Sequence, residues 1–262
     1  MTAPEERSLQ LAGSQAPVRV WEKGEGERLG VLGGLLGFPR WSPFLEALAR
    51  RRRVVVPSLP GFPGGGDFRV LDDLADWVIH TLDLLEAADL LGADWVGFGP
   101  GGTLAAEAAA FSPGSLRRLV LVAPLGLFDE AEPVRDFWAL RASEVPAAFS
   151  ARPELLFREL LAPPEGTDEV EWKLAQVRAM EAAARLLWPT GDRGLARRLH
   201  RIRAETLLLW GSEDALVPAS YAKRFAEGIS GATRIVSLSG AGHRADVDAP
   251  EALAEAILDF LG

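Results

Sequence analysis

The chain has 262 residues, of which 48% are hydrophobic and 25% are charged, so it can bury a large core. The formal net charge of -9 disfavours binding to nucleic-acid phosphates and to anionic membrane surfaces. There are no cysteines and only three histidines, which excludes disulfides and thiolate nucleophiles and makes a zinc site hard to assemble. We therefore expect no metal and no other cofactor.

The chain starts with acidic and polar residues, unlike a signal peptide, and its apolar runs are shorter than the roughly 18 residues needed to span a bilayer. These features predict a cytoplasmic protein without membrane contact. They leave a small molecule as the expected partner and do not define an oligomeric state.

Apolar runs alternate with helical patterns along the first half of the chain. Two short strands, at 9–11 and 17–24, read as a hairpin around a Gly-Ser break. Beyond them, uninterrupted apolar runs separated by amphipathic stretches indicate a mainly parallel sheet covered on both faces. The predicted strands are 28–34, 53–58, 94–99 and 116–124, and the predicted helices are 42–50, 71–88 and 101–111.

The alternation stops after this half and returns near the C-terminus. Residues 125–189 contain helical stretches rich in Trp, Phe, Leu and Ala but no strand-like run. We therefore predict a core of residues 1–125 and 190–262 with a helical cap inserted at 126–189. The returning elements are strands at 206–211 and 234–240 and helices at 219–228 and 250–262.

Two clusters of basic residues are interpreted as solvated surface. The arginines at 50–53 fall in the last turn of a predicted helix, where positive charge opposes the helix dipole. In the segment 193–203, Leu195, Leu199 and Ile202 share one face, which predicts an amphipathic surface helix with His200 on its polar side.

Five motifs follow one another along the chain: LGGLLGFPRW at 32–41, VPSLPGFPGG at 56–65, VGFGPGG at 96–102, LLLWGSEDALVP at 207–218 and SGAGHRADVDAPEALAEAILDFL at 239–261. Their order resembles the α/β-hydrolase superfamily, in its capped, esterase- and lipase-like branch. The resemblance implies that these motifs are, in chain order, an oxyanion loop, a loop that usually reads as a Pro-Asp-Leu-Pro-Gly turn, a nucleophile elbow, an acid loop and a histidine loop. It also implies an α/β-hydrolase fold, with a twisted, mostly parallel sheet of about eight strands, helices on both faces and a helical cap.

Carried over to this chain, the family pattern makes Asp214 the acid and His243 the base, and it puts Gly99 at the nucleophile position. Glycine has no side chain that could attack a substrate. The next residue, Pro100, has no N–H to serve as an oxyanion donor. The remaining donor of the family pattern is the N–H of Leu35, which follows Gly34. Conventional serine-esterase chemistry is therefore unexpected.

Three functions stay open. In the first, the Asp214–His243 pair acts as a general base, without a serine, on a small apolar carbonyl compound, an ester or an acidic C–H substrate. In the second, the chain is a non-catalytic pseudo-hydrolase that binds a small hydrophobic ligand. The third is a hydrolase with an unrecognised nucleophile, for which Ser42, Ser58 and Thr103 are the candidates.

Further residues complete the predicted site. Phe98 and Pro100 flank the vacant position, and aromatic side chains of the cap are expected to line an apolar pocket. Asp246 and Asp248 either pair with Arg244 or occupy the first turn of the final helical region, and we favour the second interpretation. The expected pocket-lining residues of the cap are Phe128, Trp138 and Trp188.

Overall fold

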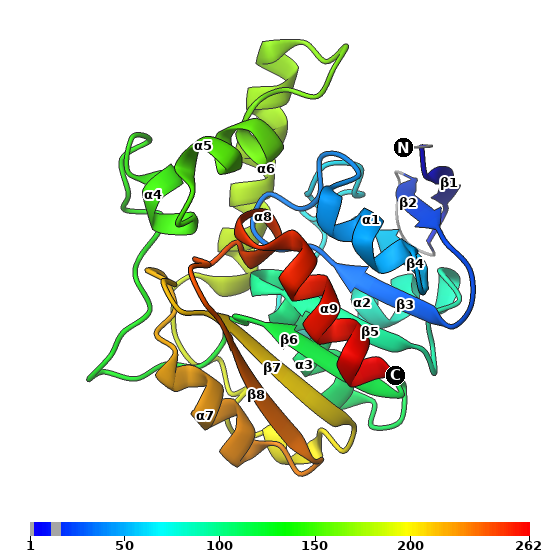
Figure 1. The fold of residues 1–262 in the computed structure, drawn as a ribbon, viewed down its shortest axis with the longest axis vertical. Helices are drawn as coiled ribbons and strands as arrows, with labels where there is room; N and C mark the ends of the chain where they lie inside the picture. Colours follow the sequence, from blue (N-terminus) through cyan, green and yellow to red (C-terminus); the bar gives the residue numbers. More distant parts are fainter. Residues whose placement is uncertain (1–2, 12–16) are drawn as a thin grey trace.

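The computed structural model describes residues 3–11 and 17–262. They form an eight-stranded sheet in the order β1-β2-β4-β3-β5-β6-β7-β8 (Figure 1). β2 pairs antiparallel with β1 and β4, and the other neighbours are parallel. The strands are β1 (Glu5–Leu9), β2 (Val18–Lys23), β3 (Arg28–Leu32), β4 (Arg53–Pro57), β5 (Asp94–Phe98), β6 (Arg118–Val122), β7 (Glu205–Gly211) and β8 (Thr233–Leu238).

Helices cover both faces of this sheet because successive strand residues point to opposite sides. In β7, Leu207 and Leu209 pack with α1 and α9, whereas Leu208 and Trp210 pack into the core formed with α2, α3 and α7. The predicted sheet of about eight mostly parallel strands with helices on both faces is confirmed. These helices are α1 (Pro43–Ala49), α2 (Leu74–Ala87), α3 (Gly99–Phe111), α7 (Ser220–Gly228) and α9 (Pro250–Leu261).

The segment between β6 and β7 contains helices and no strand, in agreement with the predicted helical pattern of 125–189. Figure 1 shows these helices gathered on one side of the molecule, with α5 beside the short helix α8 (Ala245–Asp248). The elements are α4 (Val145–Phe149), α5 (Pro153–Leu156), the π-helix η1 (Phe157–Leu161) and α6 (Glu169–Leu187).

Two predictions of local structure were wrong. The first strand ends at Leu9 instead of including Leu11, and part of the predicted hairpin break lies outside the described residues. The segment 193–203 contains only the 3-10 turn η2 (Leu199–Arg201) instead of an amphipathic helix. Gly194, at φ +97°, stops a regular helix there, and Arg198 reaches across to the carboxylate of Glu107 on α3.

The prediction that 50–53 forms a solvated arginine cluster was wrong for Arg52. Its side chain is buried, and it donates hydrogen bonds to Asp94 and to the carbonyl oxygens of Leu261 and Gly262. Pairing with these acceptors offsets the cost of removing the guanidinium from water. Arg50, by contrast, forms an exposed ion pair with Glu251.

Candidate functional site

The junction between β5 and α3 has the backbone of a nucleophile elbow. β5 ends at Phe98, and Gly99 begins α3 with φ +43°, a conformation that side chains rarely adopt. A Cβ atom at Gly99 would lie 3.5 Å from Nε2 of His243 and 3.9 Å from the backbone N of Leu35. Any side chain at position 99 would therefore face the histidine.

Asp214 holds His243 in a fixed orientation. Oδ1 of Asp214, in the loop after β7, accepts hydrogen bonds from the backbone N–H groups of Leu216 and Val217 at 2.8 and 2.9 Å. Its Oδ2 lies 3.0 Å from Nδ1 of His243. The two side chains are only 1% and 3% exposed. With Nδ1 engaged by the carboxylate, Nε2 is the nitrogen that faces position 99.

The loop after β3 supplies one N–H beside this histidine. Leu35 N is near the position that a Cβ of Gly99 would occupy, and a turn closed by Gly37 N–H and the carbonyl of Gly34 shapes the loop. Pro100 has no N–H on the opposite side. The structure thus offers Leu35 as a donor and offers none at position 100.

A buried arginine joins the histidine loop to this N–H loop. Arg244, 2% exposed, forms a bidentate ion pair with Asp246 at 2.7 and 2.8 Å. Its Nη1 also donates to the carbonyl of Leu35 at 2.7 Å. Both interpretations of Asp246 therefore hold, because it pairs with Arg244 and also lies in the first turn of the short helix α8.

Asp248 attaches the end of α4 to the histidine loop. Its carboxylate accepts hydrogen bonds from Ser150 Oγ, from the N–H of Ala151 at 3.0 Å and from the N–H of Gly242 at 2.7 Å. This role of Asp248 was not predicted from the sequence. Apolar neighbours on both sides of Asp248 imply that it is buried, and this pattern could have indicated the role.

Phe149 covers the histidine. Its ring makes an edge contact with the ring of His243 at a centroid distance of 6.0 Å, and its carbonyl accepts the N–H of Arg244 at 2.8 Å. His243 is consequently only 4% exposed. A ligand would need this side of the site to move before it could contact Nε2.

The three aromatic residues predicted to line a pocket do not come together around His243. Phe128 and Trp188 are 39% and 51% exposed, and Trp138 packs edge-on against Trp188 at 5.6 Å. Trp138 stacks on Phe137, which contacts Phe149, so it reaches the histidine only through two other rings. Phe128, Trp138 and Trp188 line none of five prominent cavities among the described residues.

The hydroxyl groups considered as substitute nucleophiles have other partners. Ser42 caps α1 by accepting the N–H of Leu45, and Thr103 donates to the carbonyl groups of Gly99 and Leu125. Ser58 accepts a hydrogen bond from Arg19. No bond to His243 is found for Ser42, Ser58 or Thr103 within the described part of the chain.

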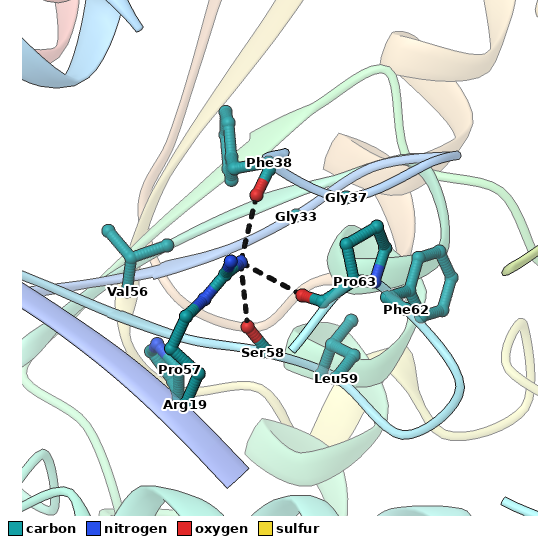
Figure 2. A pocket seen from close by; sticks show the side chains of 10 residues that line it. All are labelled: Arg19, Gly33, Gly37, Phe38, Val56, Pro57, Ser58, Leu59, Phe62 and Pro63. Carbon is teal, nitrogen blue, oxygen red and sulfur yellow. Dashed lines mark hydrogen bonds between the residues drawn. The ribbon is translucent and has the colours of Figure 1, made fainter. Parts of the chain in front are cut away.

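Figure 2 shows why Ser58 is engaged elsewhere. Nη2 of Arg19 donates to the carbonyl oxygens of Phe38 and Pro63 as well as to Ser58 Oγ. Burial lowers the pKa of Arg19 to about 10, with the charge of Glu6 acting in the opposite direction. The cavity beside these groups has a volume of about 10 Å³, which is room for about one water molecule. This corner is therefore a structural junction between loops.

The described residues contain no group of three or more His, Asp and Glu side chains able to hold a metal ion. Among the helices that the structure describes, none is long and apolar enough to cross a membrane.

The chain belongs to the alpha/beta hydrolase family, whose sequence model matches residues 33–256. It is similar to 2-hydroxy-6-oxo-2,4-heptadienoate hydrolase of Pseudomonas putida, with 26% identity over 241 residues, 87% of this chain and 85% of that protein. It is also 28% identical to 2-hydroxymuconate semialdehyde hydrolase of Pseudomonas sp. strain CF600 over 246 residues, 87% and 83% of the two chains.

Solved structures show the same fold. A meta-cleavage product hydrolase from Pseudomonas fluorescens superimposes with a TM-score of 0.75 and 20% identity, covering 97% of each chain. A 2-hydroxy-6-oxo-6-phenylhexa-2,4-dienoate hydrolase from Rhodococcus gives a TM-score of 0.77 with 17% identity, covering 99% of each chain. The relatives are thus hydrolases that act on small molecules.

Proposed function

We propose that this protein performs general-base chemistry on a small carbonyl compound through His243 and Asp214, without a nucleophile at position 99. The observation that carries the proposal is the distance of 3.0 Å between Nδ1 of His243 and Oδ2 of Asp214, with Nε2 directed at position 99, 3.5 Å from where a Cβ atom of Gly99 would lie. A histidine held in this way presents a basic lone pair to a group that reaches this position.

The chemical step uses groups of this chain, the substrate and water. In hydrolysis, His243 Nε2 takes a proton from water while the water oxygen forms a bond to the substrate carbonyl carbon, and Asp214 stabilises the imidazolium. The bond from that carbon to the leaving group then breaks, and the leaving carbon or oxygen takes the bonding electrons and the proton from Nε2. With an acidic C–H or enol O–H, Nε2 takes the substrate proton, the electron pair is shared by the enolate oxygen and carbon, and the proton returns to carbon. The N–H of Leu35 can donate to the charge that develops on the carbonyl oxygen.

The names of the relatives suggest a substrate class. Both curated relatives carry names of hydrolases for oxo-dienoates or a semialdehyde, which are small conjugated carbonyl compounds. Such compounds have acidic enol protons and an electrophilic carbonyl, the two features on which a histidine base can act. We therefore expect the substrate to be a conjugated keto acid or aldehyde of similar size.

The test measures turnover of 2-hydroxymuconate semialdehyde and of short p-nitrophenyl esters, together with labelling by a fluorophosphonate that reacts with activated serines. We expect turnover of the conjugated carbonyl compound without a covalent label. His243→Ala should lower the rate by about 10²-fold or more. His200→Ala is the matched control, because His200 is exposed and lies outside the site, and it should keep full activity.

A non-catalytic binding protein is the second candidate, favoured by the 4% exposure of His243 and by the missing N–H at Pro100. Saturable binding of these compounds without any turnover would establish this candidate and refute the first. Covalent labelling of the unmodified chain would refute both and establish the third possibility, a hydrolase with another nucleophile.

A further inference from the structure

A cavity of about 150 Å³ lies beside the candidate site but does not include it. The loop after β3, the α5–η1 segment and the α8–α9 junction form its walls, with Arg40, Arg152, Leu155 and Val247 among the lining residues. His243, Asp214 and Gly99 do not line it. α5 and α8, on either side of this cavity, are neighbours in Figure 1.

The carboxylates of this cavity are already paired. Glu159 accepts a hydrogen bond from Nε of Arg158 at 2.8 Å. Asp246 is bound in bidentate fashion by Arg244, behind the cavity wall. Neither carboxylate is therefore available to neutralise a further cation at the wall.

Two arginines of the wall lack an anionic partner. Arg40 donates to the carbonyl oxygens of Arg158 and Ala162 at 2.9 and 2.7 Å, and its Nε is buried without a hydrogen bond. Within residues 3–11 and 17–262, no carboxylate forms an ion pair with Arg40 or Arg152. In a chain of net charge -9, this is a local excess of positive charge at a partly enclosed space.

Apart from Ser42 and Arg158, the rest of the wall is apolar. Phe38, Leu155, Leu160 and Val247 line the space together with three prolines. A cavity of about 150 Å³ can hold one benzene-sized body. Apolar surface of this extent favours a hydrocarbon part over a bare inorganic anion, because the anion would leave that surface without contacts.

We propose that this cavity is a binding site for a small organic carboxylate that carries one ring or a short hydrocarbon chain. Guanidinium groups match the planar carboxylate and bind it through two parallel hydrogen bonds. Arg152 donates to the carboxylate, the positive charge of Arg40 adds to the attraction, and the side chains of Phe38 and Leu155 contact its apolar body. The site is separate from the chemistry proposed for His243 and does not depend on it.

The test titrates the full chain with benzoate by calorimetry and by ligand-observed NMR, with acetate, benzyl alcohol and sulfate as comparison ligands. We expect saturable binding of benzoate that is stronger than binding of the other three. Arg152→Gln should weaken benzoate binding about tenfold, since it removes one charged partner. Arg141→Gln is the matched control, because Arg141 is 85% exposed and does not line the cavity, and it should leave the affinity unchanged.

A second variant, Leu155→Asp, places a negative charge in the same wall and should abolish benzoate binding while circular dichroism confirms that the fold is kept. Absence of saturable benzoate binding overturns the proposal. Equal binding of sulfate and benzoate also overturns it, as does an unchanged affinity in Arg152→Gln. None of these measurements requires turnover, so their failure is distinguishable from failure of the function proposed for His243.

Discussion

The two halves of the candidate site differ in which parts of the family pattern they contain. The acid–histidine half has its side chains in place, with Asp214 fixed by two backbone N–H groups and His243 bound at 3.0 Å. The elbow half has the backbone in place, with Gly99 at φ +43°, but it offers neither a nucleophile nor an N–H at Pro100.

This difference shows that the shape of an elbow and its chemistry depend on different atoms. The turn requires a residue that tolerates positive φ, and glycine does so without the steric cost that serine bears. Catalysis by attack requires an oxygen that glycine lacks. A fold can thus have the backbone geometry of an elbow without a side chain that could attack a substrate.

The largest expected effect on activity comes from the acid–histidine half. Asp214→Asn replaces the carboxylate that orients His243 and should lower the turnover number by about 10²–10⁴-fold. Steady-state rates with a conjugated keto acid, measured at pH 7.5, provide the test. A loss of less than threefold would mean that the pair only connects two loops.

The link between the acid–histidine half and the Leu35 loop can be broken at Arg244. Arg244→Met leaves the Asp246 carboxylate buried without its partner, and we expect a loss of about 3–5 kcal/mol in the free energy of unfolding. Urea denaturation followed by tryptophan fluorescence measures it. The matched control is Arg50→Met, since the Arg50–Glu251 pair is exposed and should cost no more than about 1 kcal/mol.

The elbow half can be rebuilt in two steps. Gly99→Ser alone should lower stability by about 1–3 kcal/mol because of the positive φ, and it should give little esterase activity. Adding Pro100→Met restores an N–H donor, so the double variant should exceed the single one by about 10²–10³-fold in p-nitrophenyl acetate hydrolysis. High activity of the single variant would show that Leu35 suffices as the donor.

The smallest effect concerns a histidine outside both halves, which must be separated from His243 in any pH study. Burial lowers the pKa of His80, with the charge of Asp83 partly opposing it. The unfolded chain therefore binds the proton more readily, so stability is fully present above pH 6.5 and is lost as the pH falls below it. Urea denaturation at pH 7.5 and 5.5 should show this loss, and His80→Gln should reduce it.

The sequence was sufficient to predict the sheet, because buried parallel strands appear as apolar runs such as RVVVP in β4 and ETLLLWG in β7. The position of Gly99 beside His243 also followed from the order of motifs along the chain, and the short distance between them agrees with it. The role of these residues in catalysis stays a prediction.

Other parts of the site could not be predicted for physical reasons. Phe149 covers His243 only because Asp248 and Arg244 bind the end of α4, and such long-range contacts leave no periodic pattern in the sequence. The sequence left open whether Asp246 pairs with Arg244, because the burial that favours such a pair depends on the packing around it. The segment 193–203 shows the opposite situation, because its sequence has an amphipathic pattern but the structure has no α-helix there. The positive φ of Gly194 and the contacts to α3 outweigh the local helical pattern.

The hydrogen bond from Arg244 to the carbonyl of Leu35 joins residues that are 209 positions apart. During synthesis from the N-terminus, the Leu35 loop leaves the ribosome long before its partner does. The loop therefore cannot form this contact until residue 244 has been made. Contacts between residues so far apart in the chain form slowly, so the loop beside His243 reaches its final arrangement late in folding.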